Sequence, residues 1–197
     1  MQKGEEARVA LIDAAMQEAS RIGLASVTLA PVAKRAGWSK GGLLRHFPTR
    51  ESLQLAVVHR ATERFRQHVI LPALSSKSGG PRLRSIYRNW LQFATRSDLE
   101  GGCPLNAARL EFDDQPGEVR DAVAAAWREL LGYLEKQATK AIEQHEIRTD
   151  LSPRQVATLI VGLIGACDNA TRLLGDRHAI RDAEHTFERL FPTKSHP

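Results

Sequence analysis

The segment covering residues 27–53 constrains the fold more than any other stretch of the chain, because it contains two short helices separated by a tight turn. In the first helix, apolar residues fall at helical spacing over residues 29–36. Thr28 is placed to cap the free N–H groups at the start, and Gly37 favours a left-handed conformation at the end. Local signals therefore define both ends of this helix.

The second helix is hardly two turns long and is expected to span about Lys40–Phe47. Ser39 is placed to cap it, and Pro48 prevents its extension. Gly41 and Gly42 each cost roughly 1 kcal/mol relative to alanine inside a helix, so some other interaction must offset them. A residue without Cβ lets a groove or a phosphate approach closely. The alternative is that both glycines only permit close packing against another helix.

Positive charge gathers on the same segment. No acidic side chain occurs between Glu18 and Glu51, whereas six basic residues do. The net charge of +5 is unevenly spread: residues 1–64 hold ten Lys and Arg against six Asp and Glu, and residues 65–197 hold 18 against 17. Duplex DNA is a polyanion whose counterions such a face can displace, so the pattern indicates a DNA-binding head. The six basic residues are Arg21, Lys34, Arg35, Lys40, Arg45 and Arg50.

A series of short motifs surrounds the two helices. They are Thr28, Ala36-Gly37, Ser39-Lys40-Gly41, His46-Phe47 and Pro48-Thr49-Arg50-Glu51-Ser52-Leu53. With these motifs the chain resembles the TetR family of bacterial one-component regulators, closely over about residues 5–66 and elsewhere only in helix count and length.

The resemblance implies an all-α fold with two domains. Residues 1–66 would form a three-helix DNA-binding domain with a helix-turn-helix at about 28–47. Residues 67–197 would form a helical bundle for ligand binding and dimerisation. The DNA-binding residues implied in this way are Thr28, Ser39, Lys40, Gly41, Gly42, Arg45, His46, Thr49 and Arg50.

The chain departs from the family pattern at three places. The family usually has a tyrosine late in the recognition helix, and this chain has Leu44 and Arg45 there; an arginine can hold a phosphate or read guanine. Trp38 replaces a small aliphatic residue at the turn, and we expect it to pack as core between the two helices, with direct DNA contact as the alternative. Ala30 and Pro31 replace an acidic residue, which leaves Thr28 as the main cap.

The rest of the chain keeps a helical period, with no alternating strand pattern. A long linking helix should begin after Thr49 and stop before Pro72, and residues 75–81 read as a loop. The expected helices cover about residues 5–22, 29–36, 40–47, 50–71, 82–96, 104–112 and 117–145, followed by one that opens near Pro153 and a last one up to about Phe191.

The penultimate helix carries an apolar stripe that is broad for one helix. By resemblance, the last two long helices pair with those of a second copy. A single short helix contacts too few bases to recognise an operator. A two-fold dimer would double the contacts on a pseudo-palindromic site. The expected interface residues are Val156, Ile160, Leu163, Ile164, Cys167, Phe187 and Phe191.

By the same resemblance, the C-terminal domain offers an apolar pocket for a small apolar or aromatic effector, whose binding would release a repressor from DNA. For each candidate lining residue, the alternative is an ordinary core position. Cys103 also allows a second hypothesis, a regulator that senses oxidation through this thiol. The candidate residues are Trp90, Phe93, Cys103, Asn106, Arg109, Phe112 and Trp127.

Several other classes of function find no support in the sequence. An enzyme that uses Cys103 with a histidine is a remote alternative, because the chain has no phosphate-binding glycine loop, metal-ligand cluster or nucleophile elbow. We expect no cofactor and no metal. The two cysteines make no disulfide framework, no apolar run approaches a membrane span, and no signal peptide begins the chain, so we expect a cytoplasmic protein without a membrane partner.

Overall fold

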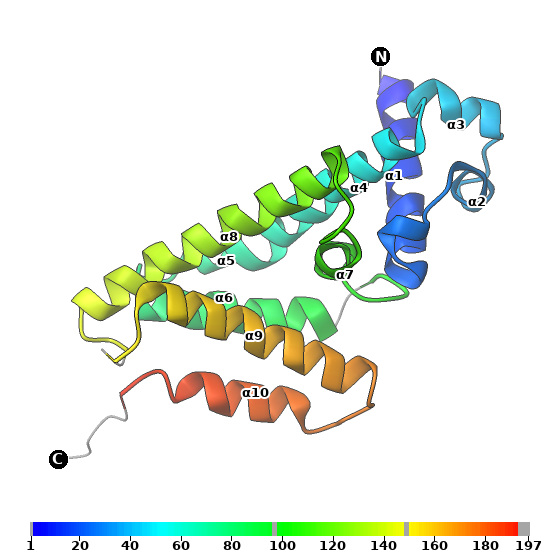
Figure 1. Cartoon of the computed structure of the whole chain (residues 1–197). Coiled ribbons are helices and arrows are strands. Elements are labelled where there is room, and N and C mark those ends of the chain that lie inside the picture. Colours follow the sequence, from blue (N-terminus) through cyan, green and yellow to red (C-terminus); the bar gives the residue numbers. More distant parts are fainter. Residues whose placement is uncertain (1, 96–97, 148–149, 193–197) are drawn as a thin grey trace. The chain divides into compact units, whose positions relative to one another are not determined.

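The computed structural model describes residues 2–95, 98–147 and 150–192, and every regular element in these ranges is a helix (Figure 1). The all-α prediction is therefore confirmed, and most helix bounds lie close to those expected. The expected end of one helix at Arg96 falls outside the described residues. The helices are α1 (Gln2–Ile22), α2 (Leu29–Arg35), α3 (Lys40–His46), α4 (Arg50–Phe65), α5 (Leu71–Ala73), α6 (Gly80–Thr95), α7 (Pro104–Glu111), α8 (Glu118–Glu143), α9 (Pro153–Arg172) and α10 (Ala179–Glu188).

The described residues group into two compact units that do not follow the order of the chain. The first unit contains residues 2–64 together with 98–127, and the second contains 65–95, 128–147 and 150–192. Helices α1 to α3, most of α4, α7 and the start of α8 thus belong to the first unit. The helix-turn-helix therefore shares a compact body with a segment that begins about fifty residues after it, at residue 98.

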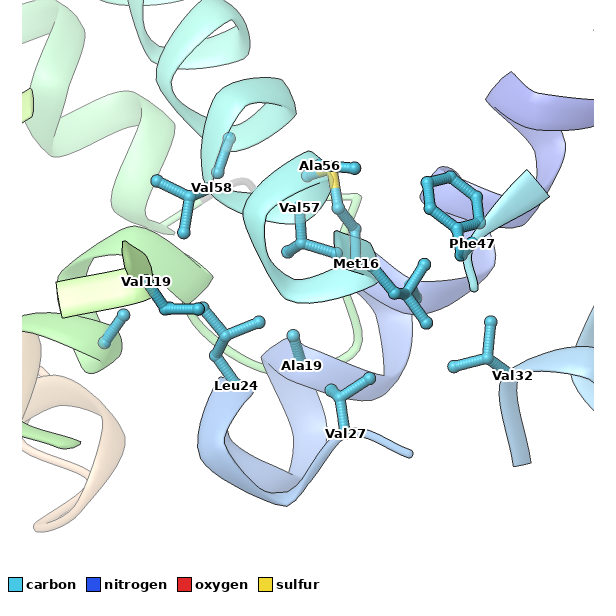
Figure 2. Close-up of a cluster of buried hydrophobic side chains, with 14 of the residues drawn as sticks. Met16, Ala19, Leu24, Val27, Val32, Phe47, Ala56, Val57, Val58 and Val119 are labelled. Carbon is cyan, nitrogen blue, oxygen red and sulfur yellow. The ribbon is translucent and has the colours of Figure 1, made fainter. Parts of the chain in front are cut away.

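The core of the first unit brings apolar faces of these helices together (Figure 2). Met16 and Ala19 of α1 lie near Val57 of α4, with Val119 of α8 at the edge of the same cluster. All four side chains are buried. Because α1 and α4 contribute residues at helical spacing, the period of the sequence accounts for this packing.

The turn between α1 and α2 is held by side chains from elsewhere in the first unit. The backbone N–H of Ala25 donates to Glu111 Oε2 on α7 at 2.6 Å. The buried Gln54 of α4 donates to the carbonyl of Leu24 at 2.8 Å. Gly23 adopts φ 84°, and a Cβ there would lie 2.8 Å from the Glu111 carboxylate. The positive φ therefore favours glycine at this turn, and any other residue would also have to displace the Glu111 carboxylate.

The linking helix differs from the expectation that it would stop before Pro72. After α4 the chain widens into a π-helical turn, Arg66–Ile70, and continues through Pro72 in α5. In a regular α-helix the proline ring would clash with the carbonyl of His68, and a wider turn relieves that clash. The carbonyl of Val69 accepts a hydrogen bond from Asn89 Nδ2 at 3.1 Å. The prediction was wrong because the wider π-helical turn lets the helix continue through the proline.

The second unit packs α6 against α9 and α9 against α10. Tyr87 of α6 stacks on Phe187 of α10 with ring centroids 3.9 Å apart, and its hydroxyl donates to the carbonyl of Ala183 at 3.0 Å. Burial raises the pKa of Tyr87, so the hydroxyl stays a donor. Among the described residues, no helix combines the length and apolar character needed to cross a bilayer.

Glycine substitutions in the two units should have opposite effects. A Cβ at Gly101 would lie 1.7 Å from the backbone oxygen of Ser20, so Gly101→Ala must displace the segment from α1. We expect a loss of about 1–3 kcal/mol in the free energy of unfolding. Gly132 lies within α8, and a Cβ there meets nothing within 4 Å. Gly132→Ala should therefore stabilise by roughly 0.5–1 kcal/mol. Denaturant unfolding measures both, and equal stability of the two variants would contradict the packing described.

Candidate nucleic-acid interface

Helix α3 is short, and its position is fixed from both ends. Ser39 adopts an extended N-cap conformation and its Oγ accepts from the N–H of Gly42 at 3.1 Å, as the sequence predicted. Leu43 and Phe47 point into the core and are almost completely buried. These contacts hold α3 with its opposite face toward solvent, which is the arrangement a recognition helix needs.

The start of α4 carries a reciprocal cap. The N–H of Ser52 donates to Thr49 Oγ1 at 3.0 Å, and the N–H of Thr49 donates to Ser52 Oγ at 3.2 Å. Serine here takes the place that glutamate or glutamine has in the usual capping box. Thr49 therefore has a structural task in addition to the DNA contact that the sequence predicted for it.

The nine residues predicted to bind DNA lie on α3 and on the two turns that flank the α2–α3 pair. Gly42 and His46 are half-buried, and the others are exposed. Thr28 occupies the N-cap position of α2, but its side chain makes no cap hydrogen bond, so the expectation that it would be the main cap is wrong. The seven exposed residues are Thr28, Ser39, Lys40, Gly41, Arg45, Thr49 and Arg50.

The six basic residues of this segment are not equivalent in the structure. Arg21 and Arg35 pair with carboxylates, and Arg50 donates to the carbonyl of Ala25. In the described part of the chain, the other three have no ion-pair partner. The cationic surface is therefore narrower than the sequence suggested, because half of the charge serves contacts within the protein. The three remaining cations are Lys34, Lys40 and Arg45.

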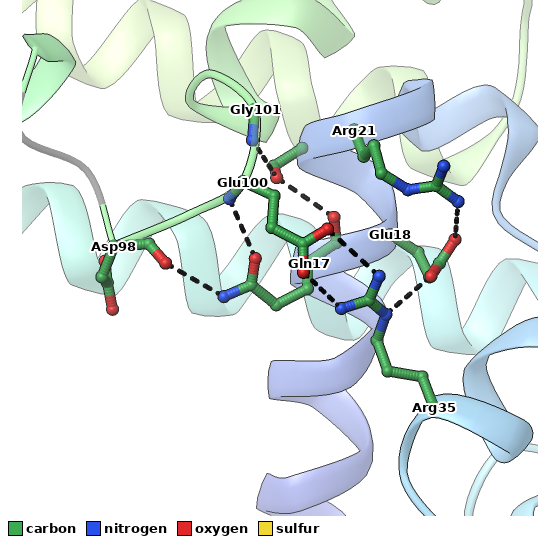
Figure 3. Close-up of polar contacts among 8 residues, drawn as sticks. Gln17, Glu18, Arg21, Arg35, Asp98, Glu100 and Gly101 are labelled. Atoms are coloured by element: carbon green, nitrogen blue, oxygen red, sulfur yellow. Dashed lines mark hydrogen bonds and ion pairs between the residues drawn. The ribbon is translucent and has the colours of Figure 1, made fainter.

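Arg35, at the end of α2, lies between two carboxylates (Figure 3). Its Nε is 2.6 Å from Glu18 Oε1 on α1, and its Nη1 is 2.6 Å from Glu100 Oε1. Glu18 is buried, and its hydrogen bond from Arg35 lowers the pKa of the carboxyl below the ordinary value of 4.5. The same guanidinium also lowers the pKa of Glu100. This cluster was not predicted from the sequence, because no local pattern connects residues so far apart.

Further hydrogen bonds attach the segment around Glu100 to α1 (Figure 3). Gln17 Nε2 donates to the carbonyl of Asp98 at 3.1 Å, and its Oε1 accepts from the N–H of Glu100 at 3.0 Å. The N–H of Gly101 donates to Ser20 Oγ at 2.9 Å. One face of α1 thus holds this segment by its backbone while Glu100 holds the helix-turn-helix.

The two glycines of α3 have different surroundings, which separates the two explanations given for them. A Cβ at Gly42 would lie 3.0 Å from Cε3 of Trp38, so this glycine permits close packing. A Cβ at Gly41 would meet nothing within 4 Å. Packing within the protein therefore accounts for Gly42 and not for Gly41.

Trp38 is not the core residue that we expected. Its side chain is 37% exposed, and its ring meets the ring of His46 edge to face at a centroid distance of 5.6 Å. The buried space between α2 and α3 is filled instead by small and aliphatic side chains, Val32 and Leu43 among them. The prediction was wrong because the ring packs beside Gly42 and His46 of α3, where it stays partly exposed.

The candidate effector residues fall into both units. Trp90 and Phe93 belong to the second, where each meets Phe65, with ring centroids 5.0 and 6.0 Å apart. The other five belong to the first. There the Arg109 guanidinium lies 5.2 Å from the ring centre of Trp127, and its Nε donates to Asn106 Oδ1 at 3.1 Å. Cys103, directly before α7, is half-buried, and Phe112, directly after it, is buried.

The residues expected at a dimer interface are mostly buried within the single chain. Leu163 is half-buried, and the other six are buried against the rest of the second unit. The broad stripe of α9 thus faces α6 and α10 of the same chain. A cavity of about 90 Å³ remains beside it, lined in part by Ile164 and Cys167. Burial raises the pKa of Cys167, which keeps this thiol protonated.

Comparison with known proteins places both parts of the chain in one group. A model of the tetracyclin repressor-like C-terminal domain matches residues 79–187, and a model of the tetR family of bacterial regulatory proteins matches residues 11–57. Comparison with curated proteins finds no match.

Several solved structures are similar to this one over almost the whole chain. A TetR transcriptional regulator from Chloroflexus aurantiacus is 25% identical with a TM-score of 0.85, covering 95% of this chain and 94% of that one. E. coli NemR in its reduced form is 18% identical with a TM-score of 0.81, covering 97% and 100%. AibR in complex with isovaleryl coenzyme A and operator DNA is 20% identical with a TM-score of 0.79, covering 94% and 98%.

The lowered pKa of Glu18 predicts a specific dependence of stability on pH. Its contribution is fully present above the ordinary value of 4.5 and is lost as the pH falls through the lower folded-state value. Glu18→Gln removes the charge that Arg35 contacts, so this variant should unfold more easily than the parent at neutral pH. The difference should shrink as the pH falls below 4.5. Unfolding across pH, with the exposed Glu129→Gln as control, measures this. A difference that does not change with pH would contradict the role given to the charge.

Proposed function

Because the chain belongs to the TetR family of bacterial transcriptional regulators, we propose that it is a repressor that binds a pseudo-palindromic operator as a homodimer in the cytoplasm. A small apolar or aromatic effector would release it from the DNA. The domains proposed for these tasks are residues 1–66 for DNA binding and 67–197 for effector binding and dimerisation.

One observation carries the DNA-binding part of the proposal. Lys40 and Arg45 lie exposed on α3 without an ion-pair partner in the described chain, while Leu43 on the opposite side fixes the helix in the core. Gly41 lies between them with open space around it, which suits close approach of a phosphate or a base edge. Charge, exposure and backbone access therefore all favour the same face of α3 as the DNA-binding surface.

The coupling of effector to DNA is supported by the packing of α7. Arg109 and Glu111 lie on this short helix; Arg109 contacts the Trp127 ring, and Glu111 holds the N–H of Ala25 at the start of the helix-turn-helix. A ligand that contacts the Trp127 group displaces α7 only if its affinity differs between two positions of that helix. We propose that such a shift reaches α2 through Glu111 and through Glu100, which holds Arg35.

The dimerisation part of the proposal needs a face of α9 that the chain leaves uncovered. Thr158, Gly162 and Ala166 are exposed and four residues apart, so they form one row along the helix. A Cβ at Gly162 would meet nothing within 4 Å. Small side chains in a row permit close approach of a second helix, and Leu163 beside them is half-buried. We therefore propose this row, in place of the buried stripe, as the contact with a second copy.

Substitution of the unpaired cations tests DNA binding. Lys40→Ala or Arg45→Ala should weaken binding to an operator duplex by roughly 1–3 kcal/mol and lower the slope of affinity against salt, because fewer counterions are released. The exposed Lys136→Ala in α8 removes equal charge away from α3 and should change neither quantity. Gel shifts over a salt series measure both. Unchanged affinity of the α3 variants at every salt concentration would contradict the proposal.

A charge in the exposed row of α9 tests dimerisation. Ala166→Glu should leave the fold of the single chain intact, since this position is exposed, and should shift sedimentation from dimer to monomer. Operator affinity should fall at the same time, because two half-sites are no longer engaged together. Thr139→Glu on the exposed side of α8 is the control. A dimer that survives Ala166→Glu would move the interface away from this row.

A further inference from the structure

The backbone of Trp38 is fixed by the way α2 ends. Gly37 adopts φ 72°, its N–H donates to the carbonyl of Lys34 at 3.2 Å, and the N–H of Trp38 donates to the carbonyl of Ala33 at 2.8 Å. This pair of bonds around a left-handed glycine is the Schellman arrangement. In it, the residue that follows the glycine usually packs its side chain back on the helix that has just ended.

The side chain of Trp38 packs instead along the next helix. Its ring lies where a Cβ on Gly42 would be 3.0 Å away, and it meets the edge or face of His46 one helical turn later. Gly42 and His46 are the two half-buried positions of α3, between its buried face and its exposed face. The indole therefore extends the solvent-facing side of the recognition helix by a flat apolar surface.

Two features of this indole are not accounted for by contacts within the described chain. More than a third of the side chain is exposed, and among the described residues no acceptor bonds to its N–H. Tryptophan carries a large apolar area and a single donor, and buried tryptophans usually satisfy that donor.

The charges near Trp38 favour one kind of binding partner for this surface. In the part of the chain that the structure describes, Lys34, Lys40 and Arg45 have no ion-pair partner, and they lie on the same two helices, which suits a polyanion and opposes a cationic partner.

We propose that Trp38 is a direct DNA contact whose contribution to affinity does not depend on salt. The inference rests on the proposed function. The indole N–H donates to a phosphate oxygen at the edge of the groove that α3 enters, and the exposed ring packs on the adjoining deoxyribose or thymine methyl. A neutral donor releases no counterion, so Trp38 adds affinity without adding to the salt slope that lysine and arginine produce.

The salt dependence separates this role from that of the cations. The probe is the duplex that the parent enriches from a random-sequence library. Trp38→Phe keeps a ring beside Gly42 and removes the donor; we expect about tenfold weaker binding and an unchanged slope against salt. Trp38→Ala should weaken binding further. The control is Leu110→Ala, which removes another exposed apolar side chain and should leave affinity unchanged.

A second measurement reads the contact itself in the parent protein, with Trp38→Phe as the reference. Iodide quenching of the parent, minus that of Trp38→Phe, isolates the exposed indole among the three tryptophans. Addition of the selected duplex should protect this component from iodide. Equal DNA affinity of parent and Trp38→Phe, or an unprotected indole, would overturn the inference while leaving the proposed function intact. A parent that enriches no duplex would overturn both, and protection by lipid vesicles in place of DNA would do the same.

Discussion

The contact of the buried Glu18 with Arg35 is the interaction on which the first unit depends. A carboxylate out of solvent needs a charged partner, and Arg35 supplies it across 2.6 Å. The same guanidinium reaches Glu100, so one side chain joins α1, α2 and the segment after α6. The position of the helix-turn-helix is therefore tied to a part of the chain that also leads into α7.

The basic residues of the head divide into two groups with different tasks. Arg21 and Arg35 neutralise Glu18, which stabilises the fold and leaves those charges unavailable to a phosphate. Lys40 and Arg45 have no such partner in the described chain and lie on the exposed face of α3. A count of charges overestimates the electrostatic contribution to DNA binding, because a cation that is already paired releases fewer counterions.

In the second unit, too, the number of residues of one kind does not show what they contact. The stripe of α9 is broad enough for two neighbours, and α6 and α10 of the same chain are those neighbours. Ile160 and Phe187 are buried there. The exposed side of α9 includes a row of small residues, Thr158, Gly162 and Ala166, which suits a helix that approaches closely more than it suits a large apolar seam.

The sequence by itself determined the all-helical class, the helix-turn-helix with its Ser39 cap, and the basic character of the head, because periodicity, capping and charge are local properties. Only the tertiary structure decided which cations are free, where the α9 stripe points, that Trp38 is exposed and that α5 continues through Pro72. Each of these depends on contacts between distant residues, such as those of Arg35 with Glu100, 65 positions away, and no local pattern encodes such a pairing.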